Sequence, residues 1–247
     1  MADEPDSTGD AMFALELLQA INDWQKSSSD KRGNTLKNLA ADLPSHFRTC
    51  GLCCFRQIAL GKGSVWDLLA ENELPEKISA WTTDLGVAKS FKGGVPPEGQ
   101  GWQGVIFVMY PQPEHVVLNL SALYQDTAFT EAIDQHKPSI SNFADGIGRY
   151  WNSQSEVIIE ISDLSVPDVH ALGGFSSNRD DVAQLFFERA PTVEELEWFD
   201  NALEQSGEQL GPVWMDGDGL DRVVKRMQPH VQKLKEIKAA QQSAQDQ

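Results

Sequence analysis

The sequence predicts an α+β protein in which helices flank a β-sheet at both ends of the chain. Residues 104–110 (GVIFVMY) and 156–161 (EVIIEI) are short, apolar and rich in β-branched side chains, which is typical of buried strands. Residues 12–25 and 193–203 repeat their apolar side chains with helical spacing, which is typical of amphipathic helices. Because helical and strand patterns do not alternate regularly, the order favours α+β over a doubly wound sheet.

The expected elements follow in order along the chain. Residues 1–10 are polar and are expected to form a disordered tail. Besides the two helices above, helices are expected at 35–43, 64–72, 85–91 and 220–240, the last interrupted at Pro229, and residues 182–188 are expected to form a helix or a strand. Besides the two strands above, strands are expected at 52–60, 116–120 and 168–172, and residues 78–83 are expected to form a short strand or a turn.

Polar and glycine-rich segments are expected to connect these elements. Residues 27–34 (SSSDKRGN) predict a polar loop, and residues 92–104 hold five glycines and two prolines, which predicts a mobile loop. Residues 121–150 are expected to mix helix and loop. We expect one domain at residues 11–205, including the N-terminal helices, and a helical extension at residues 206–247.

Composition narrows the classes of function. The chain has 247 residues and a formal net charge of -17, which disfavours a protein that coats nucleic acid, because phosphates attract Lys and Arg. No apolar run is long enough to cross a bilayer, and the start MADEPDSTGD has neither the basic nor the apolar stretch of a signal peptide. We therefore expect a cytoplasmic protein that does not engage a membrane.

The three cysteines all lie in one short stretch, which favours a reducing compartment over a disulfide framework. Cys50, Cys53 and Cys54 follow His46, and four such side chains can hold zinc. The alternative is a buried strand that uses cysteine as a small apolar residue. The second interpretation is the prediction, so no metal site is expected.

Three short polar motifs lie within or beside apolar strands, where a charge is costly unless it is paired. The first is Phe55-Arg56, whose guanidinium can bind a phosphate or form a core ion pair. The second is the segment 79–84 (SAWTTD), whose hydroxyls can orient a neighbouring charged group or cap the next helix. The third is Gln154-x-Glu156, where strand alternation predicts that both side chains share one face.

The order of the three motifs resembles the R–S–E signature of the toxin-type mono-ADP-ribosyltransferases. In that family an aromatic-Arg pair precedes a Ser-Thr-Ser-like strand and a Glu/Gln-x-Glu motif. The helix after the second motif ends in Ala88-x-x-Phe91, as in the family, and the glycine-rich loop stands where toxin members keep a mobile loop over NAD. The resemblance covers residues 47–172 and implies a split β-sheet core. The Thr-Thr of the second motif and an insertion around residues 121–150 depart from the pattern.

The resemblance implies that NAD is the substrate and that Glu156 is the catalytic carboxylate. Glu156 would hold the ribose 2′-hydroxyl and stabilise the positive charge that develops as the nicotinamide bond breaks. Arg56 would bind the phosphates of NAD. The other residues implied in NAD binding are Ser79, Trp81, Thr82, Thr83 and Phe91.

Gln154 implies the class of acceptor. Family members with Gln at this position modify asparagine or guanine rather than arginine, and Tyr150 and Trp151 lie on the loop that contacts the acceptor. We therefore expect transfer of ADP-ribose to a nucleic-acid base or a protein side chain, as in toxins of toxin–antitoxin and antiviral defence systems. An antitoxin or a chaperone is an expected partner, and the basic segment 222–238 is a candidate contact. An NAD glycohydrolase and a non-enzymatic zinc- or peptide-binding module are the alternatives.

Overall fold

The computed structural model describes residues 12–61, 64–71, 76–96, 102–162, 164, 166–173, 179–206 and 213–245. The chain divides into two compact units, and each is described by itself. Unit 1 comprises Met1–Arg56, Asn72–Ala88 and Val108–Leu164, and unit 2 comprises Gln57–Glu71, Lys89–Phe107 and Ser165–Gln247. The predicted tail at residues 1–10 and residues 97–101 of the predicted mobile loop lie outside the described residues.

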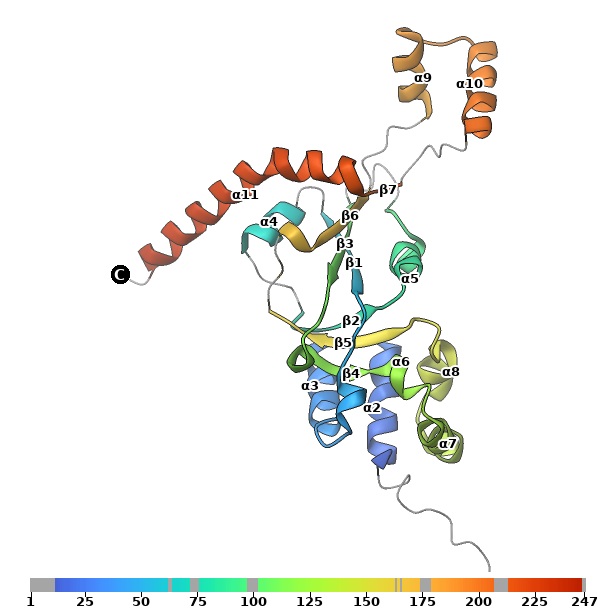
Figure 1. Ribbon diagram of the computed structural model, residues 1–247, viewed down its shortest axis with the longest axis vertical. Coiled ribbons are helices and arrows are strands. Elements are labelled where there is room, and N and C mark those ends of the chain that lie inside the picture. Colours follow the sequence, from blue (N-terminus) through green and yellow to red (C-terminus); the bar gives the residue numbers. More distant parts are fainter. Residues whose placement is uncertain are drawn as a thin grey trace, which may run out of the picture. The chain divides into compact units, whose positions relative to one another are not determined.

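The structure combines helices with a β-sheet, as the sequence predicts (Figure 1). The helices are α2 (Leu15–Lys26), α3 (Asp30–Leu39), α4 (Ser64–Glu71), α5 (Leu85–Ser90), α6 (Leu120–Leu123), α7 (Thr127–His136), α8 (Ile147–Tyr150), α9 (Arg179–Phe187), α10 (Val193–Ser206) and α11 (Gly217–Gln245). The strands are β1 (Cys54–Gly61), β2 (Ile78–Thr82), β3 (Trp102–Met109), β4 (Val116–Asn119), β5 (Glu156–Glu160), β6 (Val169–Gly173) and β7 (Trp214–Met215). In the part of the chain that the structure describes, no helix is long and apolar enough to cross a membrane.

The strands follow one order in each unit. In unit 1 the order is β4-β5-β2-β1, and in unit 2 it is β3-β6-β7. In unit 1, β2 pairs antiparallel with β5 along its whole length, from Ile78↔Glu160 to Thr82↔Glu156. The β1–β2 pair is also antiparallel and has one Cα partner pair, Phe55↔Thr82. The three strands that carry the polar motifs are therefore neighbours.

The core of unit 1 lies between its sheet and the helices α2 and α3 (Figure 1). The predicted face of α2 is buried, with Leu17, Ile21 and Trp24 each at most 3% exposed. Helix α3 approaches β2 closely because Gly33 has no side chain: a Cβ there would lie 2.6 Å from Cγ2 of Ile78. This contact leaves no room between α3 and the sheet.

Helix α3 begins earlier than the sequence predicts. The residues from Asp30 onward belong to the helix rather than to a polar loop. Ser29 caps the helix, since its Oγ accepts a hydrogen bond from the backbone N–H of Arg32, and Asp30 lies in the first turn. The prediction failed because charged residues mask the helical period in this segment.

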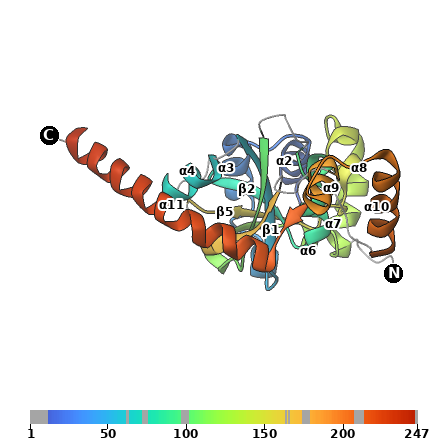
Figure 2. The same ribbon diagram turned by 90° about the horizontal axis from the view of Figure 1, so that it is seen from above.

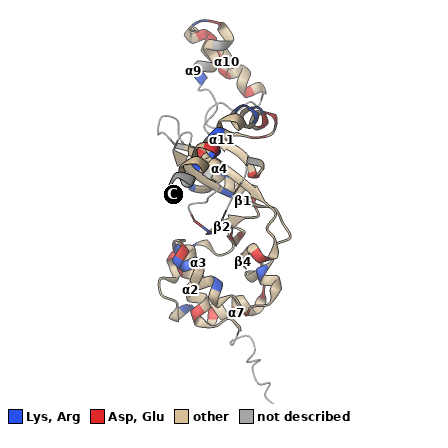
Figure 3. Cartoon of the chain, turned by 90° about the vertical axis from the view of Figure 1, so that its left-hand side faces the viewer, with Lys and Arg blue, Asp and Glu red and all other residues tan. Residues whose placement is uncertain are grey.

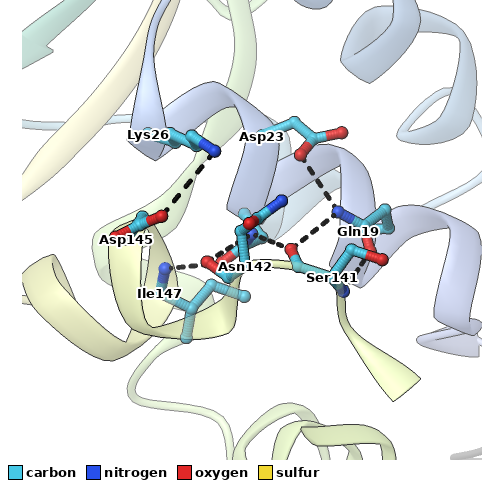
Figure 4. Close-up of polar contacts among 8 residues, drawn as sticks. Gln19, Asp23, Lys26, Ser141, Asn142, Asp145 and Ile147 are labelled. Atoms are coloured by element: carbon cyan, nitrogen blue, oxygen red, sulfur yellow. Dashed lines mark hydrogen bonds and ion pairs between the residues drawn. The ribbon is translucent and has the colours of Figure 1, made fainter. Parts of the chain in front are cut away.

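The side of α2 that bears Gln19 and Asn22 holds the segment 141–147 in place (Figure 4). The fully buried Asn22 side chain donates to the carbonyl of Ser141 at 3.0 Å and accepts from the backbone N–H of Ile147 at 2.9 Å. Gln19 accepts from the backbone N–H of Ser141 at 2.8 Å. A side chain at Gly146 would collide with the Asn22 backbone, because its Cβ would lie 2.3 Å from that carbonyl oxygen. The segment leading to β5 is thus fixed by α2.

Helix α11 packs against α4 in unit 2, with Val65 and Leu69 of α4 and Val231 of α11 buried. It runs as one helix from Gly217 to Gln245 (Figure 2), so the predicted interruption at Pro229 is wrong. Proline removes one backbone hydrogen bond, and Pro229 is exposed, so water can bind the carbonyl that this leaves free. The charged residues of helix α10 are all acidic (Figure 3).

Candidate functional site

The three polar motifs meet on neighbouring strands of unit 1. Phe55 of β1 is the Cα partner of Thr82 of β2, and Thr82 is the Cα partner of Glu156 of β5. Directly opposed residues in an antiparallel ladder project to the same face, so these three side chains share one face of the sheet. Alternation along β1 directs Arg56 to the opposite face. The structure therefore brings Thr82 and Glu156 together and separates Arg56 from them.

Glu156 is a buried carboxyl group held by α2. It is 5% exposed, and the indole N–H of Trp24 donates to its Oε1 at 2.6 Å. Burial raises the pKa of Glu156 from 4.5 to about 7, against the lowering effect of hydrogen bonds from Trp24 and Gln25. The hydroxyl of Tyr124 donates to Oε1 of Gln25 at 2.9 Å and extends this network. The group thus changes between carboxyl and carboxylate near neutral pH.

The threonines of the second motif bind the backbone rather than charged side chains. The backbone N–H of Asp84 donates to Oγ1 of Thr82 at 3.0 Å, and the backbone N–H of Thr83 donates to the carbonyl of Ser155 at 3.1 Å. Asp84 caps α5, because its Oδ1 accepts from the backbone N–H of Gly86 at 2.7 Å. These bonds fix the end of β2 against the turn before β5.

Arg56 forms an ion pair with the partly exposed Glu76, and one of its donor groups is buried without a partner among the described residues. Its side chain is 12% exposed, and Nη2 lies 2.8 Å from Oε2 of Glu76. Burial lowers the pKa of Arg56, while Glu76 raises it. Among the described residues, the buried Nη1 has no hydrogen-bond partner. An unsatisfied buried donor costs about 1–3 kcal/mol, which an anionic ligand would recover.

Ser79 and Trp81 bond to each other inside the protein. Both are buried, and the indole N–H of Trp81 donates to Oγ of Ser79 at 3.1 Å. The two side chains lie two residues apart on β2 and so share a face. Their polar atoms satisfy one another, which gives them a packing role in this structure.

The loop predicted to contact an acceptor is a turn that precedes β5. Trp151 has a backbone φ of 43° and is 42% exposed, and its ring packs at a tilt against that of Tyr124, with 4.9 Å between ring centres. Its carbonyl accepts from Nε2 of Gln25 at 3.1 Å. Tyr150 is half-buried, and the guanidinium of Arg149 lies 5.1 Å from its ring centre. An aromatic side chain is therefore accessible in this turn.

Gln154 differs from its prediction, because it lies in the turn and not in the strand. Strand β5 starts at Glu156, and Ser155 between them has a φ of 44°, in the left-handed region. The extended alternation that would place Gln154 and Glu156 on one face is broken at Ser155. Phe91, the remaining predicted residue, belongs to unit 2, where it is 42% exposed beside Nζ of Lys92.

A cavity of about 200 Å³ opens next to Thr83 in unit 1. It is lined by Cys50, Gly51, Leu52, Thr83, Asn119, Ser121, Ala122 and Gln125. Of these residues, only Thr83 and Cys50 belong to motifs that the sequence makes visible. Asn119 could not be recognised from its neighbours in sequence, because its Nδ2 donates to the distant carbonyl of Thr49 at 2.9 Å.

The cysteine cluster does not have the composition of a metal centre. Within the described ranges, no group of three or more His, Cys, Asp or Glu side chains could hold a metal ion. The ring of His46 stacks on Phe47, with 3.9 Å between ring centres, while Sγ of Cys50 lies 3.7 Å from Sγ of Cys54. The described residues thus offer two thiols together rather than a four-ligand site.

Comparison of the chain with protein-family models, with curated proteins and with solved structures found no match. The function is therefore argued from the residues of this chain and their geometry.

Proposed function

We propose that the chain is an NAD-dependent mono-ADP-ribosyltransferase with Glu156 as its catalytic carboxylate. The observation that carries the proposal is the placement of the three motifs on the neighbouring strands β1, β2 and β5, with Thr82 and Glu156 in direct register.

Glu156 supplies the charge that this reaction needs. Breaking the bond between nicotinamide and ribose builds positive charge on the ribose, and a carboxylate in a water-poor site stabilises that charge strongly. Glu156 takes the ribose 2′-hydroxyl in the position that the indole N–H of Trp24 occupies here. Since α2 covers the carboxylate, NAD binds after the Trp24–Glu156 contact opens. The structure thus corresponds to a closed form of the proposed enzyme.

The resemblance assigns Arg56 Nη1 to a phosphate of NAD, although strand alternation directs the Arg56 side chain away from the face that bears Thr82 and Glu156. The free donor supports that role, and the ion pair with Glu76 supports a purely structural one. Two variants separate the roles. Arg56→Ala removes the guanidinium. Glu76→Gln removes the ion pair but leaves the guanidinium of Arg56 in place. Weaker NAD binding in Arg56→Ala alone supports phosphate binding, and equal binding by both variants and the wild type removes Arg56 from the NAD site.

The acceptor is a nucleic-acid base or a protein side chain other than arginine. The resemblance implies this, because Gln154 stands where family members that modify other groups than arginine have Gln. Exposed Trp151 offers a ring on which a base or a protein side chain can stack. Such an activity fits a cytoplasmic toxin of a toxin–antitoxin or antiviral defence system. This toxin role predicts that expression of the wild type arrests growth and that expression of Glu156→Gln does not.

The test of the activity uses the full chain, NAD labelled in its ADP-ribose part and a cell extract. The wild type should release nicotinamide and transfer label to RNA, DNA or protein, and Glu156→Gln should do neither. Nicotinamide release without labelled macromolecule would replace the proposal with an NAD glycohydrolase. No release by either the wild type or Trp24→Phe, which frees the carboxylate of its indole donor, would refute the proposal.

A further inference from the structure

Two thiols meet at the start of β1, outside the motifs that the proposed function uses. Sγ of Cys50 lies 3.7 Å from Sγ of Cys54, and each Sγ lies 3.7 Å from the carbonyl oxygen of Leu52. This shared acceptor holds the two thiols on the same side of a short loop. Cys53, between them in sequence, forms a separate contact with Tyr110.

The two thiols differ in access and in acidity. Cys50 is half-buried and lines the cavity next to Thr83, whereas Cys54 is fully buried. The contact between the two sulfurs, in which either S–H can be the donor, lowers the pKa of Cys50 to about 6 and raises that of Cys54. The accessible sulfur therefore has the lower pKa, and the thiolate is the reactive form of a cysteine.

We propose that Cys50 and Cys54 form an oxidation site, in which a small hydroperoxide converts Cys50 to a sulfenic acid and Cys54 then closes a disulfide. In the first step the Cys50 sulfur attacks one oxygen of hydrogen peroxide, the O–O bond breaks, and the departing hydroxide takes the proton released by the Cys50 thiol and leaves as water. In the second step the Cys54 sulfur attacks the Cys50 sulfur, the S–O bond breaks, and a second water carries away the proton of Cys54. The pair loses two electrons, and the peroxide gains them.

The loop between the cysteines can make the movement that this bond requires. A disulfide joins sulfurs at about 2.05 Å, so the two atoms must approach from their present 3.7 Å. Leu52 is 61% exposed, and a Cβ at Gly51 would meet no atom of the described chain within 4 Å. The loop is therefore not packed against neighbours that would oppose the approach.

Oxidation would act on two neighbouring features. Cys54 is the first residue of β1 and precedes Phe55, and Cys50 lines the cavity that Thr83 shares. Drawing the two cysteines together changes the lining of that cavity and the start of β1. The oxidation site depends on the two thiols alone and does not require the proposed enzyme activity.

The experiment treats the reduced full chain with hydrogen peroxide and measures intact mass and free thiols. The decisive variant is Cys53→Ser, because it leaves only the proposed pair. The wild type and Cys53→Ser should each lose two thiols and the mass of two hydrogens, and dithiothreitol should restore both. A peroxide-treated Cys53→Ser protein that keeps both thiols would overturn the proposal, as would a wild-type disulfide that contains Cys53.

Two further variants define the order of the steps. Cys54→Ser should stop at a sulfenic acid on Cys50 that dimedone traps, and Cys50→Ser should react at least about tenfold more slowly, because burial still raises the pKa of both remaining thiols. A circular dichroism spectrum like that of the wild type establishes that each variant is folded. Equal peroxide reactivity of a folded Cys50→Ser protein would refute Cys50 as the attacking thiol.

Discussion

Replacing Glu156 by Gln should make the stability of the protein less sensitive to rising pH. Gln has nearly the same shape, its carbonyl oxygen can accept the indole N–H of Trp24, and it has no proton to release. In the wild type, burial raises the pKa of Glu156 from 4.5 to about 7. Between these values the unfolded chain loses a proton that the folded chain keeps. The raised pKa therefore lowers the free energy of unfolding as pH rises through this interval.

The size of the effect follows from the interval. A difference in pKa contributes about 1.4 kcal/mol per unit. Between pH 4.5 and about pH 7 the free energy of unfolding of the wild type should fall by about 3 kcal/mol, whereas that of Glu156→Gln should not show this fall. Above that range the difference between the two proteins should be constant. Below pH 4.5 both forms carry a neutral side chain, so their pH dependence should be parallel there.

Urea unfolding followed by tryptophan fluorescence between pH 4.5 and 8.5 measures this difference. Glu131→Gln is a matched control, because Glu131 is an exposed carboxylate on α7, and its curve should follow the wild type. A free-energy difference between Glu156→Gln and the wild type that does not change with pH would refute the reasoning. A difference of opposite sign would show that hydrogen bonds from Trp24 and Gln25 outweigh burial.

The remaining predictions concern the contacts of α2 and α3. Asn22→Ala should lower the free energy of unfolding by about 2–4 kcal/mol in urea, because it leaves backbone groups of the segment 141–147 unpaired; a loss under about 0.5 kcal/mol would contradict this. Trp24→Phe should move the pH range over which Glu156 lowers the stability to higher pH, because the variant loses a donor that lowers the pKa of Glu156. A shift of this range to lower pH would contradict the prediction. Gly33→Ala should cost about 1–3 kcal/mol through overpacking against β2, and an unchanged urea midpoint would show that α3 can shift.

Local sequence patterns predicted the elements of the fold better than their ends. Strands β3 and β5 and helix α2 follow from apolar periodicity, because that pattern is set by neighbours along the chain. Helix α11 continues through Pro229 because exposure, which the sequence does not state, lets solvent satisfy the freed carbonyl. Ser155 adopts a left-handed backbone that nothing in its local sequence indicates, so strand alternation was extended wrongly to Gln154.

The chemistry of the site depends on contacts between distant parts of the chain. Glu156 was selected from its motif, but its raised pKa comes from burial under α2, whose apolar face the sequence predicts without its partner. The Phe55↔Thr82 register and the Arg56–Glu76 ion pair likewise depend on how β1 meets its neighbours. Motif order indicated which strands matter, while the environment of each charge required the folded structure.

Helix α2 links the two sites that the proposed reaction needs. Trp24 holds the carboxylate of Glu156, and Gln25 holds the carbonyl of Trp151 in the turn assigned to the acceptor. Asn22 binds the segment that leads into that turn. A shift of α2 that exposes the carboxylate to NAD therefore also loosens the turn. One helix would then control access both of NAD and of the group that receives ADP-ribose. The stability of the Trp24–Glu156 contact would set how often the carboxylate of the proposed enzyme becomes accessible.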